Sequence, residues 1–107
     1  MTVMARFTTR IQLDGNPPES VYERLHAEMR GRGFLRFIKN GQGQWFKLPH
    51  AEYNRVGSVT SKQVLNEAIA AAEAAAPTFK RKIVVTEAEK RSWDGLERVT
   101  PEAVTRG

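Results

Sequence analysis

The chain of 107 residues has no cysteine and only two histidines. Without cysteine it can form no disulfide framework, thiol nucleophile or thiolate metal site, and this composition fits a reducing compartment such as the cytoplasm. The two histidines, His26 and His50, are far apart in the chain, which disfavours a structural zinc site. We therefore expect neither a metal nor a cofactor.

Long apolar runs are also missing. No run approaches the roughly 20 residues that span a bilayer, and Arg6 and Arg10 interrupt the stretch where a signal peptide would have its apolar core. The sequence therefore predicts no membrane partner. It also lacks a P-loop, a dinucleotide-binding fingerprint and a nucleophile elbow, so no common enzyme class has motif support.

The chain does have an excess of positive charge. Seventeen lysines and arginines against 12 acidic residues give a net charge of +5. This balance favours an anionic partner, nucleic acid above all, although many basic domains bind none.

Hydrophobic periodicity changes along the chain in an informative order. Strict alternation from Val3 to Leu13 predicts a strand, and helical spacing follows over residues 16–30 and 60–76. Two strands, 34–39 and 44–48, flank an Asn-Gly turn, and a last strand is expected over 79–86. The order β-α-β-β-α-β predicts an α+β domain with the ferredoxin-like plan, a four-stranded antiparallel sheet with both helices on one face. We expect one domain over 1–99 and a flexible tail over 100–107.

Both helices have recognisable start signals, whereas one connection has none. Asn16 can cap the first helix, and Thr60 with Gln63 forms a plausible capping box for the second. Residues 50–59 show no pattern from which a strand or helix can be predicted.

The ferredoxin-like plan leaves one sheet face uncovered, and here that face is predicted to be basic. Its strand order, 4-1-3-2, makes the first and last strands neighbours, so Arg6 and Arg10 would lie beside Lys80 and Lys82. Four cations on a flat face suit a phosphate backbone. The alternative is a solvated strand face on which cations only maintain solubility.

Lys47 extends this predicted nucleic-acid surface onto the returning strand. It follows Trp45 and Phe46, one of which must point outward because neighbouring strand residues face opposite sides. An outward aromatic ring can stack a base. Burial against the first helix or in a dimer interface is the alternative.

Candidate catalytic residues lie near the first strand and helix. Asp14 ends the strand, where an acidic residue can hold a metal or orient a nucleophile, but it also suits a turn before glycine. His26 could transfer a proton at a ribose 2′-hydroxyl, and Arg24 could stabilise charge on phosphorus. The alternative for His26 is an ordinary, half-exposed helix residue.

Several segments resemble the GhoS-like family, which includes the endoribonuclease antitoxin of type V toxin–antitoxin systems. The resemblance rests on residues 21–29, which Leu13-Asp14 precede at the end of a strand, on 45–54, and on 85–87 followed by 91–96, and it covers most of 5–99. It implies a ferredoxin-like fold, similar to that of small CRISPR-associated proteins that scaffold spacer integration, and cleavage of a toxin messenger RNA. Asp14 and Arg24 match family positions. His26 stands where the typifying member has an arginine linked to activity.

The sequence therefore predicts a small basic RNA-binding protein, with metal-independent endoribonuclease activity of the antitoxin type as its catalytic form. Asp14, Arg24 and His26 would carry the chemistry. Arg6, Arg10, Lys47, Lys80 and Lys82 would bind the RNA. The alternative is a non-enzymatic, homodimeric phage or mobile-element protein that binds a host or phage protein or a nucleoprotein complex.

Overall fold

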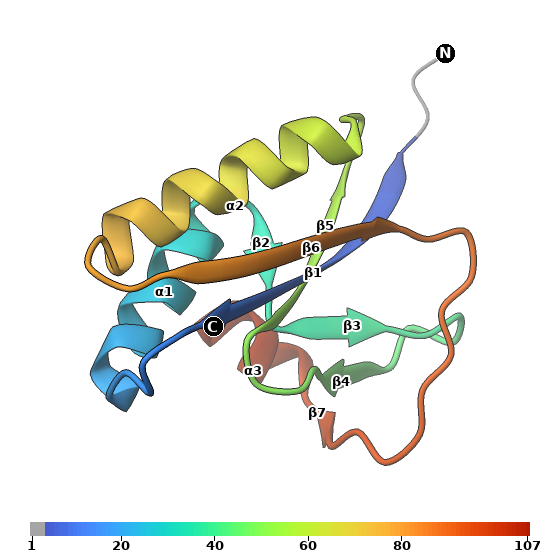
Figure 1. The fold of residues 1–107 in the computed structure, drawn as a ribbon. Helices are drawn as coiled ribbons and strands as arrows, with labels where there is room; N and C mark the ends of the chain where they lie inside the picture. The colour runs from blue at the N-terminus through green and yellow to red at the C-terminus, as the bar shows by residue number, and fades with distance from the viewer. Residues whose placement is uncertain (1–3) are drawn as a thin grey trace.

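Two antiparallel sheets and three helices make up the computed structural model, which describes residues 4–107 (Figure 1). Val3, the expected first residue of the first strand, lies outside this range. In chain order the elements are β1 (Ala5–Leu13), α1 (Glu19–Gly31), β2 (Phe34–Leu35), β3 (Phe37–Lys39), β4 (Trp45–Lys47), β5 (Glu52–Gly57), α2 (Ser61–Ala75), β6 (Arg81–Glu87), β7 (Arg98–Val99) and α3 (Pro101–Arg106). The α+β class expected from the sequence is therefore confirmed.

The central strand of the larger sheet is β1. The strand order is β2-β5-β1-β6, and every pairing in this sheet is antiparallel. The predicted alternation of β1 is confirmed, because Phe7, Thr9, Ile11 and Leu13 are buried. The residues between them face the other side of the sheet. The expected adjacency of the first and last strands also holds, since β1 pairs with β6.

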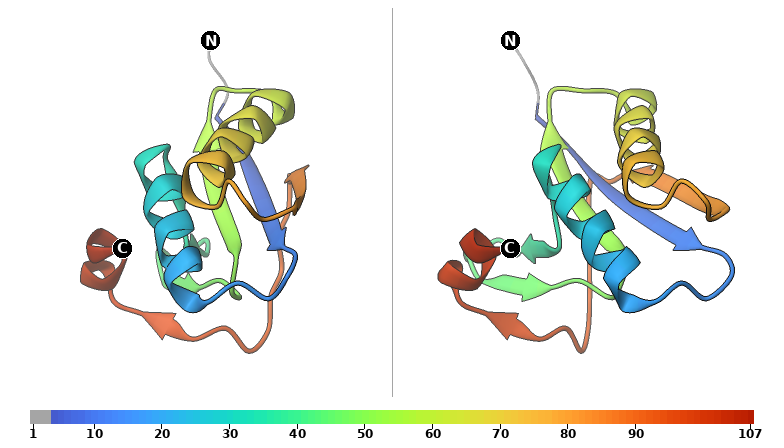
Figure 2. Two further views of the ribbon diagram at one scale, coloured as in Figure 1. Left: turned by 60° about the vertical axis from the view of Figure 1, so that its left-hand side comes forward. Right: turned by 90° about the vertical axis from the view of Figure 1, so that its left-hand side faces the viewer.

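Both long helices cover the same face of this sheet (Figure 2). Helix α1 buries the predicted stripe of Val21, Leu25 and Met29. Helix α2 buries Val64 and four alanines, whose small side chains allow close approach to its neighbours. No helix within residues 4–107 is long and apolar enough to cross a bilayer.

The simple plan of one four-stranded sheet was wrong, because a second, three-stranded sheet has the order β3-β4-β7. The strand expected over 34–39 divides into β2 and β3 at Arg36, and each half joins a different sheet. The returning strand is β4, which pairs with β3 as a hairpin but does not enter the larger sheet. Leu48 N–H donates to the Arg36 carbonyl oxygen at 2.8 Å, and this bond joins the two ends of the segment that contains β3 and β4.

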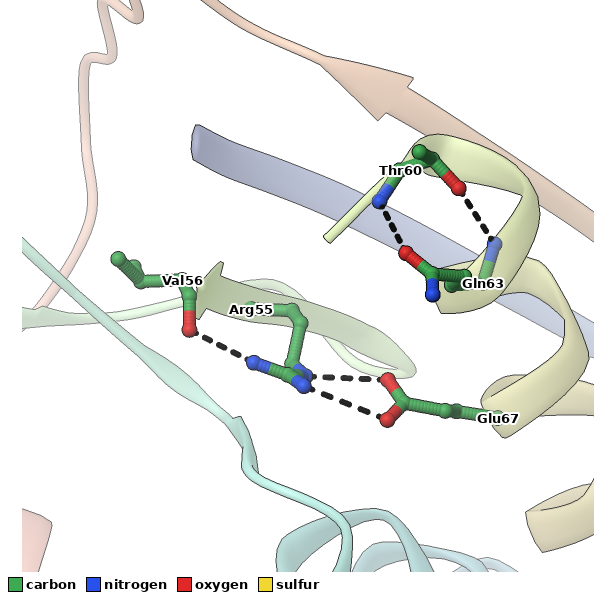
Figure 3. A network of polar contacts seen from close by, with 5 residues as sticks. All are labelled: Arg55, Val56, Thr60, Gln63 and Glu67. Carbon is green, nitrogen blue, oxygen red and sulfur yellow. Dashed lines mark hydrogen bonds and ion pairs between the residues drawn. The ribbon is translucent and has the colours of Figure 1, made fainter. Parts of the chain in front are cut away.

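The third strand of the larger sheet is β5, in the segment for which the sequence showed no pattern. It pairs with β1 on one side and β2 on the other. Its only large apolar core side chain is Tyr53, which is fully buried. On the helix side Arg55 forms a two-bond ion pair with Glu67 of α2, at 3.1 and 3.3 Å (Figure 3). Strand prediction relies on buried apolar side chains, and at this position an ion pair takes the place of an apolar contact.

The two helix starts differ from each other. The predicted Thr60–Gln63 capping box is present: Gln63 N–H donates to Thr60 Oγ1 at 3.2 Å, and Thr60 N–H donates to Gln63 Oε1 at 2.8 Å (Figure 3). The predicted Asn16 cap is wrong, because α1 begins at Glu19 after an extended Pro18 with no side-chain cap. Asn16 instead adopts φ 53°, the left-handed conformation that asparagine tolerates in turns.

Where the sequence predicted a flexible tail over 100–107, residues 101–106 form the short helix α3. Thr100 Oγ1 accepts from Ala103 N–H, Pro101 stands in the first turn, and Val104 is buried. Arg30 of α1 donates to the carbonyl oxygens of Thr105 and Arg106. A cap, a buried valine and an arginine that binds the last carbonyls explain why the segment is helical.

We expect Thr60→Ala to lower the free energy of unfolding by about 1 kcal/mol, because one N-terminal amide of α2 loses its acceptor. Urea unfolding followed by circular dichroism measures this change. Thr60→Ser is the matched control, since it keeps the hydroxyl and should stay close to wild type. Equal stability of the alanine and serine variants would contradict the prediction.

Candidate functional site

The open face of the larger sheet carries three of the predicted RNA-binding residues. Arg6 and Arg10 lie on β1, and the pairing of Gln12 with Lys82 puts that lysine on the same side of the sheet. Lys82 Nζ lies 3.4 Å from Asp14 Oδ1, so part of its charge is already neutralised. Lys80 is exposed, immediately before β6, and its carbonyl oxygen accepts from Asp14 N–H. Lys47 is on β4, in the other sheet.

Arg91 lies over this open face and was not anticipated from the sequence. Its Nη1 donates to Asn54 Oδ1 at 2.8 Å and contacts Thr8 Oγ1 at 3.5 Å. Its Nε is buried and finds no hydrogen-bond partner in the described part of the chain. No carboxylate within residues 4–107 lies at ion-pair distance from it. Burial, and secondarily the neighbouring charge of Arg6, lower the pKa of Arg91. Arg91 is therefore a fixed, partly desolvated cation whose charge no ion pair balances within the described residues.

A hollow of about 570 Å³ adjoins Arg91. Its lining combines the open sheet face with the connection from β6 to β7, and includes Thr8, Glu52, Thr86, Lys90, Arg91 and Trp93. The connection runs from the end of the larger sheet to the smaller one (Figure 1). Trp93 also packs against Phe46 of β4, with ring centroids 5.6 Å apart. The volume is in the range of small-molecule sites, and the lining offers a cation, hydroxyls and an aromatic ring.

The three predicted catalytic residues have separate partners. Asp14 pairs with Lys82 of β6, whereas Arg24 Nε donates to the Ala75 carbonyl oxygen at the end of α2, at 3.4 Å. His26 Nδ1 lies 2.6 Å from the Tyr53 hydroxyl. Arg24 thus joins the two helices, and no hydrogen bond or ion pair connects it or Asp14 to His26 within residues 4–107.

His26 instead belongs to a cluster of rings that the sequence did not reveal. The His26 and His50 ring centroids are 5.7 Å apart, and Tyr22 lies 4.5 Å from His50 in an edge-on arrangement. Burial lowers the pKa of His26 from 6.5 to about 4, helped by the positive charge of Arg36 and by His50 and Lys47. Burial also raises the pKa of Tyr53. Both groups of this hydrogen bond are therefore neutral near pH 7.

His50 reaches the cluster through an unusual backbone conformation. The next residue, Ala51, has φ 61° and is buried. Left-handed backbone is disfavoured for alanine, because its Cβ approaches the following carbonyl oxygen. The carbonyl oxygen of Ala51 nevertheless accepts from Ile11 N–H at 3.1 Å, so the turn is held by β1. The start of β5 therefore fixes the position of the turn that contains His50.

We expect the ring-proton resonances of His26 to titrate in nuclear magnetic resonance spectra with a midpoint near pH 4. Because the unfolded chain takes up this proton more readily, protonation favours unfolding. The difference in unfolding free energy between wild type and His26→Gln should therefore shift against wild type as the pH falls from 6.5 towards 4. Urea unfolding across this interval measures that shift. A midpoint near 6.5, or a constant difference, would contradict the prediction.

Compared with protein-family models, curated proteins and solved structures, the chain matches none of them. The resemblance to the GhoS-like family therefore stays a prediction.

Proposed function

We propose that this protein binds single-stranded RNA across the open face of its larger sheet, with Arg91 as the central phosphate ligand. The observation that carries the proposal is the environment of Arg91. Its guanidinium is partly desolvated, held in place by Asn54 and Thr8, and without an ion-paired carboxylate in the described chain. A desolvated charge without a counter-ion is unfavourable, and an anionic ligand relieves that cost.

Phosphate is the anion that the arginine geometry favours. A guanidinium offers planar, paired donors that match two phosphate oxygens. Asn54 and Thr8 engage Nη1 and Nε is buried, so Nη2 is the nitrogen with which Arg91 would contact a phosphate. Arg6 provides a second cation close enough to affect the pKa of Arg91. Together the two arginines suit one phosphate or two consecutive phosphates.

The surroundings of Arg91 favour a polymer over a free phosphate ion. The hollow has room for a nucleoside, and Trp93 in its lining offers a surface for base stacking. Arg10, Lys82 and Lys80 continue the positive charge along β1 and β6. Glu52 pairs with Arg10 across the sheet and Asp94 lines the hollow, so the surface is mixed in charge. Because acidic residues interrupt the basic surface, it favours an RNA strand that follows one defined path along the cations.

The proposed family and fold agree with this function. The order β2-β5-β1-β6 supports a ferredoxin-like core within residues 5–87, to which the smaller sheet and α3 are additions. We extend the proposal to membership of the GhoS-like family on the sequence resemblance. RNA cleavage is not included, because Asp14, Arg24 and His26 have separate partners and none of them lines the hollow.

We expect Arg91→Gln to weaken RNA binding at least about tenfold, because a charged hydrogen bond to phosphate contributes about 1.5–3 kcal/mol. Fluorescence anisotropy with a labelled oligouridylate at fixed salt measures the change. Arg98→Gln is the matched control, since it removes one exposed arginine from β7, outside the hollow. Equal affinities of the two variants would overturn the role of Arg91.

We also expect the logarithm of the RNA association constant to fall linearly with the logarithm of salt concentration. Each lost phosphate contact on a single strand lowers the steepness by about 0.7. Arg10→Gln, at an exposed position on the open face, should show this reduction. Absence of RNA binding at low salt, together with a dimer in sedimentation, would favour the homodimeric alternative.

A further inference from the structure

A second cluster, separate from the proposed RNA surface, has the composition of a transition-metal site. Glu19, His26 and His50 each place a possible ligand atom so that the three atoms lie within 4.8 Å of one another. Glu19 and His26 are seven residues apart on α1, which puts them on one helix face two turns apart. His50 comes from the turn before β5. Three ligands from two separate segments thus converge through the fold.

We propose that Glu19, His26 and His50 bind a zinc ion, with the fourth position open to water or another small ligand. Two imidazoles and one carboxylate, with no thiolate, form a ligand set that occurs in zinc sites with one exchangeable position. Imidazole nitrogens favour zinc over magnesium or calcium, which prefer oxygen ligands throughout. This inference does not depend on the proposed RNA binding.

His26 is held in place for such a role by a contact in the core. Its Nδ1 lies 2.6 Å from the hydroxyl of Tyr53, a residue with no exposed surface. With the proton on Nδ1, His26 donates to Tyr53 and Nε2 keeps its lone pair. Nε2 is buried and has no hydrogen-bond partner among the residues that the structure describes. Metal-binding histidines typically have the second nitrogen fixed in this manner, and Nε2 is the atom we assign to the metal.

The other two ligands can complete the geometry by small movements. Zinc bonds of 2.0–2.2 Å place neighbouring ligand atoms of a tetrahedron about 3.4 Å apart. The separations, none larger than 4.8 Å, must therefore shorten by at most about 1.4 Å. Glu19 and His50 are exposed, so their side chains are free to make this adjustment while His26 stays fixed.

Charges near the site both oppose and favour the binding of a zinc ion. The positive charges of Arg36 and Lys47 reach His26, and the N-terminus of α1 adds partial positive charge near Glu19. Against this, burial keeps His26 neutral, the form that binds metal, and Glu19 supplies a negative charge. We expect the nearby cations to make zinc binding weaker than it would be without them, and to favour an anion in the fourth position.

The test is isothermal titration calorimetry of the full chain, without a histidine tag, with zinc chloride in a non-chelating buffer free of phosphate. Wild type should bind one equivalent, and His50→Ala should lose at least tenfold in affinity. Glu19→Gln should weaken binding as well. Glu102→Gln is the matched control, because Glu102 is also an exposed glutamate in the first turn of a helix.

Cobalt gives an independent readout of the ligand geometry. Bound at the same site, it should produce the intense visible absorption of a four-coordinate ion, and His50→Ala should abolish that absorption. Tyr53→Phe should weaken zinc binding about tenfold to 100-fold, as loss of an outer hydrogen bond does. Failure of wild type to bind zinc below millimolar concentration, or equal binding by wild type and His50→Ala, would overturn the proposal.

Discussion

The double pairing of β1 is the constraint on which the other features depend. Its backbone is hydrogen-bonded to β5 on one side and β6 on the other. The alternation of its side chains therefore determines which residues face the helices and which face the open side of the sheet. Phe7 and Ile11 face the helices and anchor the core, whereas Arg6 and Arg10 face the open side. A shift of one residue in this register would place the arginines in the core. The basic face and the apolar core are therefore consequences of one set of backbone hydrogen bonds.

Sequence patterns were sufficient where burial alone decides structure, and insufficient where polar contacts do. The alternation of β1 and the stripe on α1 are readable because their buried positions are apolar. In β5, Asn54 is satisfied by Arg91 and Arg55 by Glu67, so two of its positions carry polar residues that a strand pattern does not anticipate. The pairing partner of β1 was consequently missed, and the returning strand β4 took its place in the prediction.

In the candidate sites, too, local sequence patterns predict some residues, whereas others are brought into place only by long-range contacts. The cations of the open face follow from the alternation of β1, which the sequence indicates, and from a strand order that belongs to the ferredoxin-like plan and not to the sequence itself. Arg91 lies over that face only because a long connection returns it to residues far away in sequence, Asn54 and Thr8. His26 was recognised as a titratable group, but its neighbour His50 lay in the segment without a pattern. Long-range contacts between polar groups leave no periodic signal in a single chain.

The hydrogen bond between Leu48 and Arg36 has a consequence for chain length. It joins the two ends of the segment that contains β3 and β4, so the points at which the chain leaves the larger sheet and returns towards it lie close together. Residues added at the Asn40–Gly43 turn would lengthen a loop whose ends are already fixed, and the entropic cost of such lengthening grows only with the logarithm of loop size. The hairpin tip can therefore tolerate insertions that the paired strands β1 and β5 cannot.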